Sequence, residues 1–243
     1  MNEELTPGII IKQSNFGEGH RMVWIFTEKY GIIKAAVHGA GKTKSKSSAS
    51  SQFLTYCNFS FYNSGEIWNI NNATSIDNFW GVQEDIKKLA LCTYFSELIY
   101  CSLDLHNPDS NILRLFLNML YACSYKNISL ESIKLAFEIK LLYYSGLLPR
   151  PDSCTSCGCA DELCFFNTKT GSVLCRECAK GDEAKLSENA YKVLYFFSLC
   201  DMKKLFSYML PEDGIKQLSS IIESYTISNF EQTKKSLEYY KLF

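Results

Sequence analysis

Residues 154–178 read CTSCGCADELCFFNTKTGSVLCREC, and this stretch indicates most directly what the chain folds into. It contains two C-x₂-C pairs that are separated by 17 residues. A C-x₂-C turn lets two thiolates converge on one ion, and a hairpin between the pairs brings in the other two. We therefore expect one structural Zn²⁺ in a closed tetrahedral site without an open position for a substrate. The four expected ligands are Cys154, Cys157, Cys175 and Cys178.

The other cysteines leave two alternatives open. Cys159 or Cys164 could replace one of the four ligands, although the paired spacing favours them as bystanders. A redox-active dithiol is the alternative to a metal site, but it normally lies at a strand-to-helix turn of a βαβ unit, and this setting differs. The remaining cysteines lie among apolar residues, where we expect them to be buried and inert. These are Cys57, Cys92, Cys101, Cys123 and Cys200.

Alternating apolar residues upstream of the cysteines predict β-strands in the first 80 residues. The clearest alternation is in residues 53–62, where Phe59 and Phe61 are the strongest positions of one face. Five short strands within about 70 residues favour a small barrel, and the oligonucleotide-binding (OB) fold is the commonest five-stranded choice. The candidate strands are Gly8–Lys12, Met22–Thr27, Gly31–Val37, Phe53–Tyr62 and Glu66–Ile70.

From residue 82 the apolar period changes to that of α-helices. Asn107-Pro108 and Gly146 should separate the first helices, and Ser187 should cap the helix after the cysteines. The helical patterns cover residues 86–105, 113–120, 130–144, 187–195, 215–225 and 229–240. The predicted fold class is therefore a multidomain β plus α protein. Its parts are an OB-fold barrel in residues 1–80 and an α-helical domain in residues 81–243, with a zinc finger inserted at 154–178.

Composition limits the class of protein. With 47% hydrophobic residues the chain can build a sizeable core, and its net charge of -1 means that any nucleic-acid role depends on a local patch. The N-terminus MNEELTPGIIIKQ lacks the charged and apolar regions of a signal peptide, and no apolar run approaches the ~18 residues of a membrane span. We therefore expect a cytoplasmic protein, in which clustered thiols bind metal.

Residues 12–46 form such a patch, with seven basic residues against two acidic ones. Their segment Gly39–Gln52, GAGKTKSKSSASSQ, has too few apolar residues to pack and reads as a loop whose lysines can follow a phosphate backbone. Aromatic residues on the strands, such as Trp24, Phe26 or Trp68, could add base stacking if exposed. The sequence alone leaves open the alternative of a solvated basic loop above aromatic core residues.

Residues 36–43, AVHGAGKT, also fit the loose form of a phosphate-binding loop, with Ala in place of its first Gly. However, no amphipathic helix follows, and no apolar strand ends in an Asp that could hold Mg²⁺. The three histidines are far apart, and no G-x-S-x-G motif is present. These features disfavour a nucleotidase and indicate a binding protein rather than an enzyme. A zinc-stapled scaffold that recruits partner proteins is the third hypothesis.

Several separate segments resemble the RecO family of bacterial recombination mediators. The most specific is the junction LLxxxGxxPxxxxCxxCG within FEIKLLYYSGLLPRPDSCTSCG, followed by FFNTKTGSVLCREC. The other segments are GIIIKQSNFGEGH, IFTEKYGIIKAAVHGAGKTKSK, SSQFLTYCNFSFYNSGEIWNI and YFSELI. The resemblance covers nearly the whole chain. It implies an OB-fold barrel and a helical domain with a zinc finger, and no catalytic site.

The resemblance also implies partners. Family members bind single- and double-stranded DNA, anneal complementary strands in the RecF pathway, act with RecR, and help load RecA onto DNA coated by single-strand DNA-binding protein. The tail of that coating protein is an implied partner, and the implied location is cytoplasmic and nucleoid-associated. The chain departs from the family at Gly41-Lys42, where members often have Arg after the GA, and it keeps four zinc ligands that some members lack. Carried over residue by residue, DNA contact is expected at Lys34, Lys42, Lys44 and Lys46, with Arg21 and Lys12 behind them.

Overall fold

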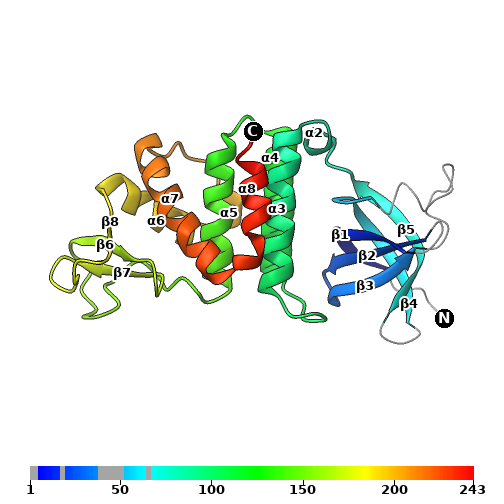
Figure 1. Cartoon of the computed structure of the whole chain (residues 1–243), viewed down its shortest axis with the longest axis horizontal. Coiled ribbons are helices and arrows are strands. Elements are labelled where there is room, and N and C mark those ends of the chain that lie inside the picture. The colour runs from blue at the N-terminus through cyan, green and yellow to red at the C-terminus, as the bar shows by residue number, and fades with distance from the viewer. Residues whose placement is uncertain (1–4, 17–19, 38–51, 64–66) are drawn as a thin grey trace. The chain divides into compact units, whose positions relative to one another are not determined.

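The computed structural model describes residues 5–16, 20–37, 52–63 and 67–243, and all structural statements concern these residues (Figure 1). The chain forms two compact units, residues 1–114 with 236–243 and residues 115–235. The domain boundary near residue 80 stays a prediction. Within the described ranges, no helix is both long and apolar enough to cross a membrane.

The first unit contains the predicted five-stranded barrel, closed in the order β1-β2-β3-β5-β4. Its strands are β1 (Leu5–Phe16), β2 (His20–Thr27), β3 (Gly31–Val37), β4 (Tyr56–Asn63) and β5 (Trp68–Asp77). β3 has the predicted bounds. β4 begins at Tyr56 instead of Phe53, and β5 continues past Ile70 to Asp77, so the sequence placed its end too early.

Side chains alternate between the interior and the outer surface of the barrel. The interior is apolar, with Ile10, Val23, Ile25, Ile33 and Phe59 fully buried and Phe61 and Trp68 packed against them. Burying such side chains stabilises a fold by roughly 1.5–3 kcal/mol each. This packing confirms that the Phe59 and Phe61 face of the predicted fourth strand is the inner one.

The barrel closes along a short seam between β3 and β5. These two strands are parallel, and within the described parts of the chain they pair only at Ala35 with Trp68 and at Ala36 with Asn69. The other neighbouring strands are antiparallel and pair over longer stretches, for example from Tyr56 to Asn63 along β4 and β5. The seam is therefore the least hydrogen-bonded junction of the barrel.

Three helices complete the first unit: α2 (Trp80–Gln83), α3 (Ile86–Ser102) and α8 (Lys234–Tyr240). The Asp85 carboxylate caps α3 by accepting hydrogen bonds from the backbone N–H groups of Lys87 and Lys88. The Lys87 ammonium donates to the backbone oxygen of Phe243 at 2.9 Å, which ties the C-terminus to α3.

The second unit carries the remaining helices and a small sheet. α4 (Ser110–Tyr125) leads into it, followed by α5 (Leu130–Tyr144), β6 (Leu163–Asn167), β7 (Ser172–Cys175), β8 (Ala184–Lys185), α6 (Glu188–Leu199) and α7 (Glu212–Asn229). The Ser187 hydroxyl accepts from the Ala190 N–H at 3.1 Å, which confirms the predicted cap. The helix predicted near 229–240 is confirmed from Lys234 to Tyr240 (α8), but its start is wrong. The chain leaves helical geometry at Phe230 (φ -131°, ψ 57°) and makes a 3₁₀ turn, Glu231–Thr233, before α8.

A buried ion cluster joins α5 to α7. The Lys134 ammonium lies 2.8 Å from a carboxylate oxygen of Glu138 and 3.1 Å from one of Glu223. Burial lowers the pKa of Lys134, but the two carboxylates outweigh it and leave that pKa raised. Removing one partner from such a cluster leaves a buried charge uncompensated.

Candidate functional site

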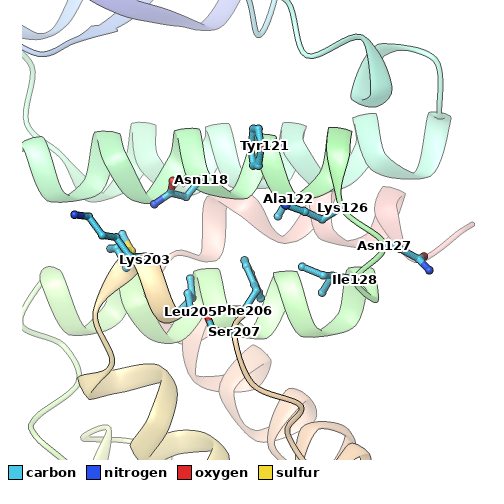
Figure 2. A pocket seen from close by; sticks show the side chains of 11 residues that line it. Asn118, Tyr121, Ala122, Lys126, Asn127, Ile128, Lys203, Leu205, Phe206 and Ser207 are labelled. Atoms are coloured by element: carbon cyan, nitrogen blue, oxygen red, sulfur yellow. The ribbon is translucent and has the colours of Figure 1, made fainter.

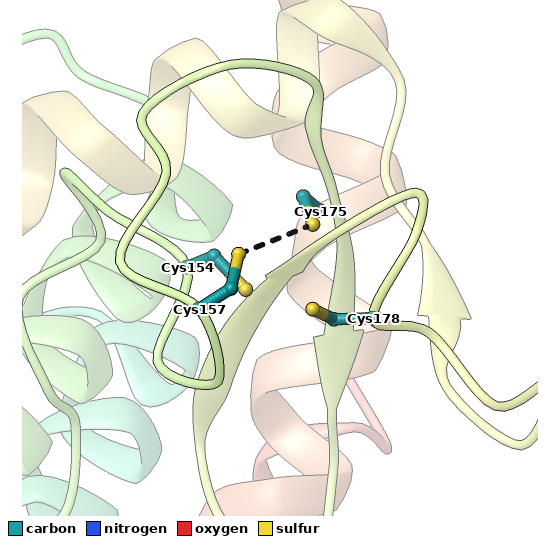
Figure 3. A group of neighbouring side chains, drawn as sticks. All are labelled: Cys154, Cys157, Cys175 and Cys178. Atoms are coloured by element: carbon teal, nitrogen blue, oxygen red, sulfur yellow. Dashed lines mark hydrogen bonds between the residues drawn. The ribbon is translucent and has the colours of Figure 1, made fainter.

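Two tight turns bring the four predicted cysteines together (Figure 3). The Cys154 N–H donates to the Cys159 carbonyl at 2.7 Å, and the Gly158 N–H donates to the Cys154 carbonyl at 2.8 Å. Gly158 has φ +78°, a conformation that favours glycine, so the G of the C-x₂-C-G sequence lets this turn close. Cys175 ends β7, and the turn that follows carries Cys178.

The four sulfurs have the spacing of a metal-binding site. All of them lie within 4.8 Å of one another, and the Cys157 and Cys175 sulfurs are 3.8 Å apart. Metal–sulfur bonds of about 2.3 Å in a tetrahedron place the sulfurs roughly 3.8 Å apart. The group can therefore hold one metal ion with little rearrangement.

Hydrogen bonds around the sulfurs favour thiolates at two positions. Burial raises the pKa of Cys154, but N–H donors of Cys175, Cys157 and Ser156 outweigh it and lower that pKa to about 6. The backbone of Cys159 lowers the pKa of Cys157. At Cys178 the Ser156 hydroxyl lowers the pKa, but the neighbouring sulfurs of Cys157, Cys175 and Cys154 raise it to about 12. The hydrogen bonds that Cys178 makes with these sulfurs therefore favour its neutral thiol, and a divalent cation is the group that would stabilise four thiolates together.

Cys159 and Cys164 are not members of this four-sulfur group. Hydrogen bonds with Cys157 and Cys175 raise the pKa of Cys159 to about 12, which disfavours its thiolate. Among the other cysteines, Cys57, Cys92 and Cys123 are buried as predicted, and Cys200 is half-buried. The prediction for Cys101 is wrong, because this residue is exposed in the last turn of α3. Helical periodicity identifies the apolar face of a helix, but it does not show where along the helix the neighbouring elements stop covering that face.

The hairpin that carries the cysteines is fastened to the helical unit. Its turn residue Gly171 has φ +69°, and a Cβ there would lie 2.5 Å from both the Leu147 carbonyl and the Tyr225 hydroxyl. That hydroxyl donates to the same Leu147 carbonyl at 2.6 Å, and the Tyr225 ring meets Phe166 edge-on at 5.7 Å. Gly171 is therefore required by a close approach as well as by its backbone angle.

On the barrel, two predicted DNA-contact lysines lie on either side of a tryptophan. Trp24 of β2 pairs with Lys12 of β1 and with Lys34 of β3. The two ammonium groups lie 5.0 and 5.6 Å from the centre of its ring, and Tyr100 of α3 meets the ring edge-on at 6.4 Å. The result is a cationic row across three strands, with the indole covered rather than open for stacking.

The other predicted DNA-contact residues are distributed differently. Arg21 lies three residues before Trp24 on β2. Because side chains of a strand alternate between its two faces, Arg21 belongs to the face opposite Trp24. Lys42, Lys44 and Lys46 lie outside the described residues, as does most of the phosphate-loop sequence 36–43. The structure therefore brings together Lys12 and Lys34 only.

The aromatic residues proposed for base stacking are buried or partly buried. Phe26 is fully buried, and Trp68 packs against Tyr30 and Phe61 over the barrel interior. A signal for Phe26 was present in the sequence, because the uninterrupted apolar run Met22–Phe26 is typical of a strand buried on both faces. The exposed aromatic that sequence reasoning missed is Tyr62 of β4, at 54% exposure.

Comparisons with known proteins agree with this architecture. The family model described as Recombination protein O C terminal matches residues 83–238, and Recombination protein O N terminal matches residues 1–79. The chain belongs to the RecO family. DNA repair protein RecO of Acetivibrio thermocellus is 31% identical, over 99% of this chain and 97% of that protein. The RecO proteins of Caldicellulosiruptor saccharolyticus (28% identical, 96% of each chain) and Alkaliphilus metalliredigens (31% identical, 86% of this chain and 81% of that protein) are also similar.

Proposed function

We propose that the chain is a DNA-binding mediator of recombinational repair that anneals complementary strands. The carrying observation is a RecO-type barrel, matched by the family model at residues 1–79, with the Lys12, Trp24 and Lys34 row on its outer surface. Annealing requires no bond-making residue. It requires strands that are held with their charge partly neutralised, and weakly enough for bases to search.

The test is an annealing assay with complementary oligonucleotides across a range of salt concentrations. We expect the protein to accelerate annealing, and we expect Lys42→Glu/Lys44→Glu/Lys46→Glu to weaken single-strand binding. The same substitutions should change neither the melting temperature nor the amount of bound metal. If the wild-type protein does not bind oligonucleotides at low ionic strength, the proposed function is wrong. If the triple variant binds single strands like wild type, those three lysines do not contribute to binding.

For the metal we propose Zn²⁺, held by Cys154, Cys157, Cys175 and Cys178. Four sulfur ligands in a tetrahedron suit zinc, and because all positions are filled its role is structural. A structural ion stabilises a small finger whose own apolar core is limited. Elemental analysis of purified protein should give one zinc per chain, and a different metal or none would contradict the assignment.

As partners we propose single- and double-stranded DNA, RecR and the tail of single-strand DNA-binding protein, with RecR assisting RecA loading, in the cytoplasm at the nucleoid. An acidic and apolar tail would match the chemistry of a pocket of about 480 Å³ in the second unit (Figure 2). Lys126 and Lys203 line it, and no carboxylate does. The apolar lining residues include Ala122, Ile128, Met202, Leu205 and Phe206.

A fluorescent peptide of the tail tests this pocket by anisotropy. Lys126→Glu/Lys203→Glu should weaken peptide binding, whereas the exposed pair Lys216→Glu/Lys235→Glu on α7 and α8 should not. Peptide binding without any DNA binding would favour the alternative function, a zinc-stapled scaffold that recruits partner proteins.

A further inference from the structure

Tyr62 is a large ring at an exposed position of the barrel. Along β4 its neighbours Phe59 and Phe61 face the interior or pack against it, so Tyr62 belongs to the outer face. Its exposed fraction is 54%, which means that the core does not require the ring. A single exposed aromatic residue is common on protein surfaces, so its neighbours decide whether it has a function.

Strand pairing places Tyr62 beside two small or polar side chains. Tyr62 pairs with Asn69 of β5, and Asn69 pairs with Ala36 of β3 across the seam. Since Ala35 and Trp68 belong to the interior cluster, Ala36 and Asn69 share the outer face with Tyr62. Adjacent strands lie about 4.8 Å apart, so the backbones of Tyr62 and Ala36 are separated by roughly 10 Å.

The charge on this face comes from Lys34. It lies two residues before Ala36 and therefore on the same face of β3, at one end of the cationic row with Trp24 and Lys12. β4 itself, YCNFSFYN, has no carboxylate, and Asp77 of β5 pairs with Tyr56 at the opposite end of β4. Among the described strand residues around Tyr62, the face thus combines an exposed ring, an amide, a methyl group and an ammonium, and it carries no carboxylate.

These groups match the parts of a nucleotide. A tyrosine ring provides a surface on which a base stacks, an asparagine amide can donate to and accept from a base edge, and a lysine attracts the phosphate. The Lys34 ammonium lies over Trp24, and Ala36, which stands between Lys34 and the Asn69–Tyr62 pair in the strand register, has a small side chain. An acidic peptide would share the lysine, but it would not need both a flat ring and an amide, as a base does.

We infer that Tyr62 stacks on a base of single-stranded DNA, in a subsite that Asn69 and Lys34 complete across β4, β5 and β3. This inference rests on the proposed function, and it adds a base-contacting residue to a surface otherwise defined by lysines. It predicts that binding depends on the presence of bases at this subsite and not only on phosphates.

The test compares two strands of equal length, oligo-dT and a strand of abasic spacers, by fluorescence anisotropy with full-length protein. Wild type should bind oligo-dT more tightly than the abasic strand. Tyr62→Thr should weaken oligo-dT binding about 5- to 150-fold, the range that corresponds to one stacked base, and leave abasic binding unchanged. Tyr62→Phe should retain the preference, since it keeps the ring. Trp80→Leu is the matched control, because Trp80 is an exposed aromatic (57%) on α2.

The salt dependence separates this inference from the proposed function. Tyr62→Thr should keep the wild-type slope of log affinity against log salt, because phosphate contacts are retained. If Tyr62→Thr binds both strands like wild type, or if Tyr62→Phe loses as much affinity as Tyr62→Thr, the stacking role is wrong while DNA binding stands. If wild type binds neither strand, the proposed function itself is wrong. Retained binding of the tail peptide, together with a normal melting temperature, shows that a variant is folded.

Discussion

Replacing Lys12 and Lys34 by glutamine gives the sharpest test of the cationic row. Both ammonium groups lie within 5.6 Å of the Trp24 ring, so one substitution pair removes the row without altering the barrel interior. Each phosphate contact on single strands contributes about 0.7 to the slope of log affinity against log salt, so losing two should reduce the slope by about 1.4. When salt rises fourfold, from about 50 to about 200 mM, the affinity of the variant should therefore fall by a factor roughly seven times smaller than that of wild type.

The measurement is an anisotropy titration with oligo-dT at several salt concentrations. Three cation–π contacts are lost, those of Lys12 with Trp24 and Tyr100 and that of Lys34 with Trp24. Each contributes about 0.5–1 kcal/mol, so the variant should remain folded by circular dichroism. Lys216→Gln/Lys235→Gln makes the same charge change on exposed helical positions and should leave the slope as it is. An unchanged slope in the Lys12 and Lys34 variant, or an equal change in the control pair, would refute the reasoning that phosphates meet this row.

Three further perturbations test the finger and the helical unit. Cys175→Ser removes one of the four sulfurs, so bound metal measured by elemental analysis should fall from one per chain towards none, whereas Cys101→Ser should leave it unchanged. Lys134→Met leaves buried carboxylates uncompensated and should lower the free energy of unfolding by about 3–5 kcal/mol in urea titrations; a loss below about 1 kcal/mol would contradict the ion cluster. Because the pKa of Lys134 is raised, the stability it contributes is fully present below pH 10.5 and disappears as pH rises through the higher folded-state value. Gly171→Ala should destabilise more than Gly181→Ala in the same titration, since both have positive φ but only at Gly171 would a Cβ meet other atoms, and equal losses would argue against the close approach.

The sequence was sufficient where one physical rule dominated. The C-x₂-C spacing predicted the four sulfurs that converge, because few arrangements other than a shared ion need two such turns. Alternation along Phe59 and Phe61 predicted the inner face of β4, because an interior excludes water from every second residue. Ser187 was identifiable as a cap from its place before a helical pattern.

The sequence was insufficient where a second element decides the outcome. The end of β5 is polar, and it forms a strand because β4 supplies hydrogen-bond partners as far as Asp77. The sequence left open whether Phe26 and Trp68 are exposed for stacking or packed in the core. Tertiary packing buries Phe26 fully, and it buries Trp68 partly, against Tyr30 and Phe61. The contribution of Lys42, Lys44 and Lys46 stays a prediction, as these residues lie outside the described ranges.

The short seam between β3 and β5 has a consequence for how the barrel responds to its ligand. Two pairs of described residues hold this junction, so transient opening of the barrel should begin there. Of the Ala35 and Ala36 amide protons, the one that faces β5 should exchange earlier than the one that faces β2. A nucleic-acid strand that touches both Lys34 and Tyr62 must pass over this junction. Bound nucleic acid would then slow the opening of this junction, and the barrel would be more rigid with its ligand than without it.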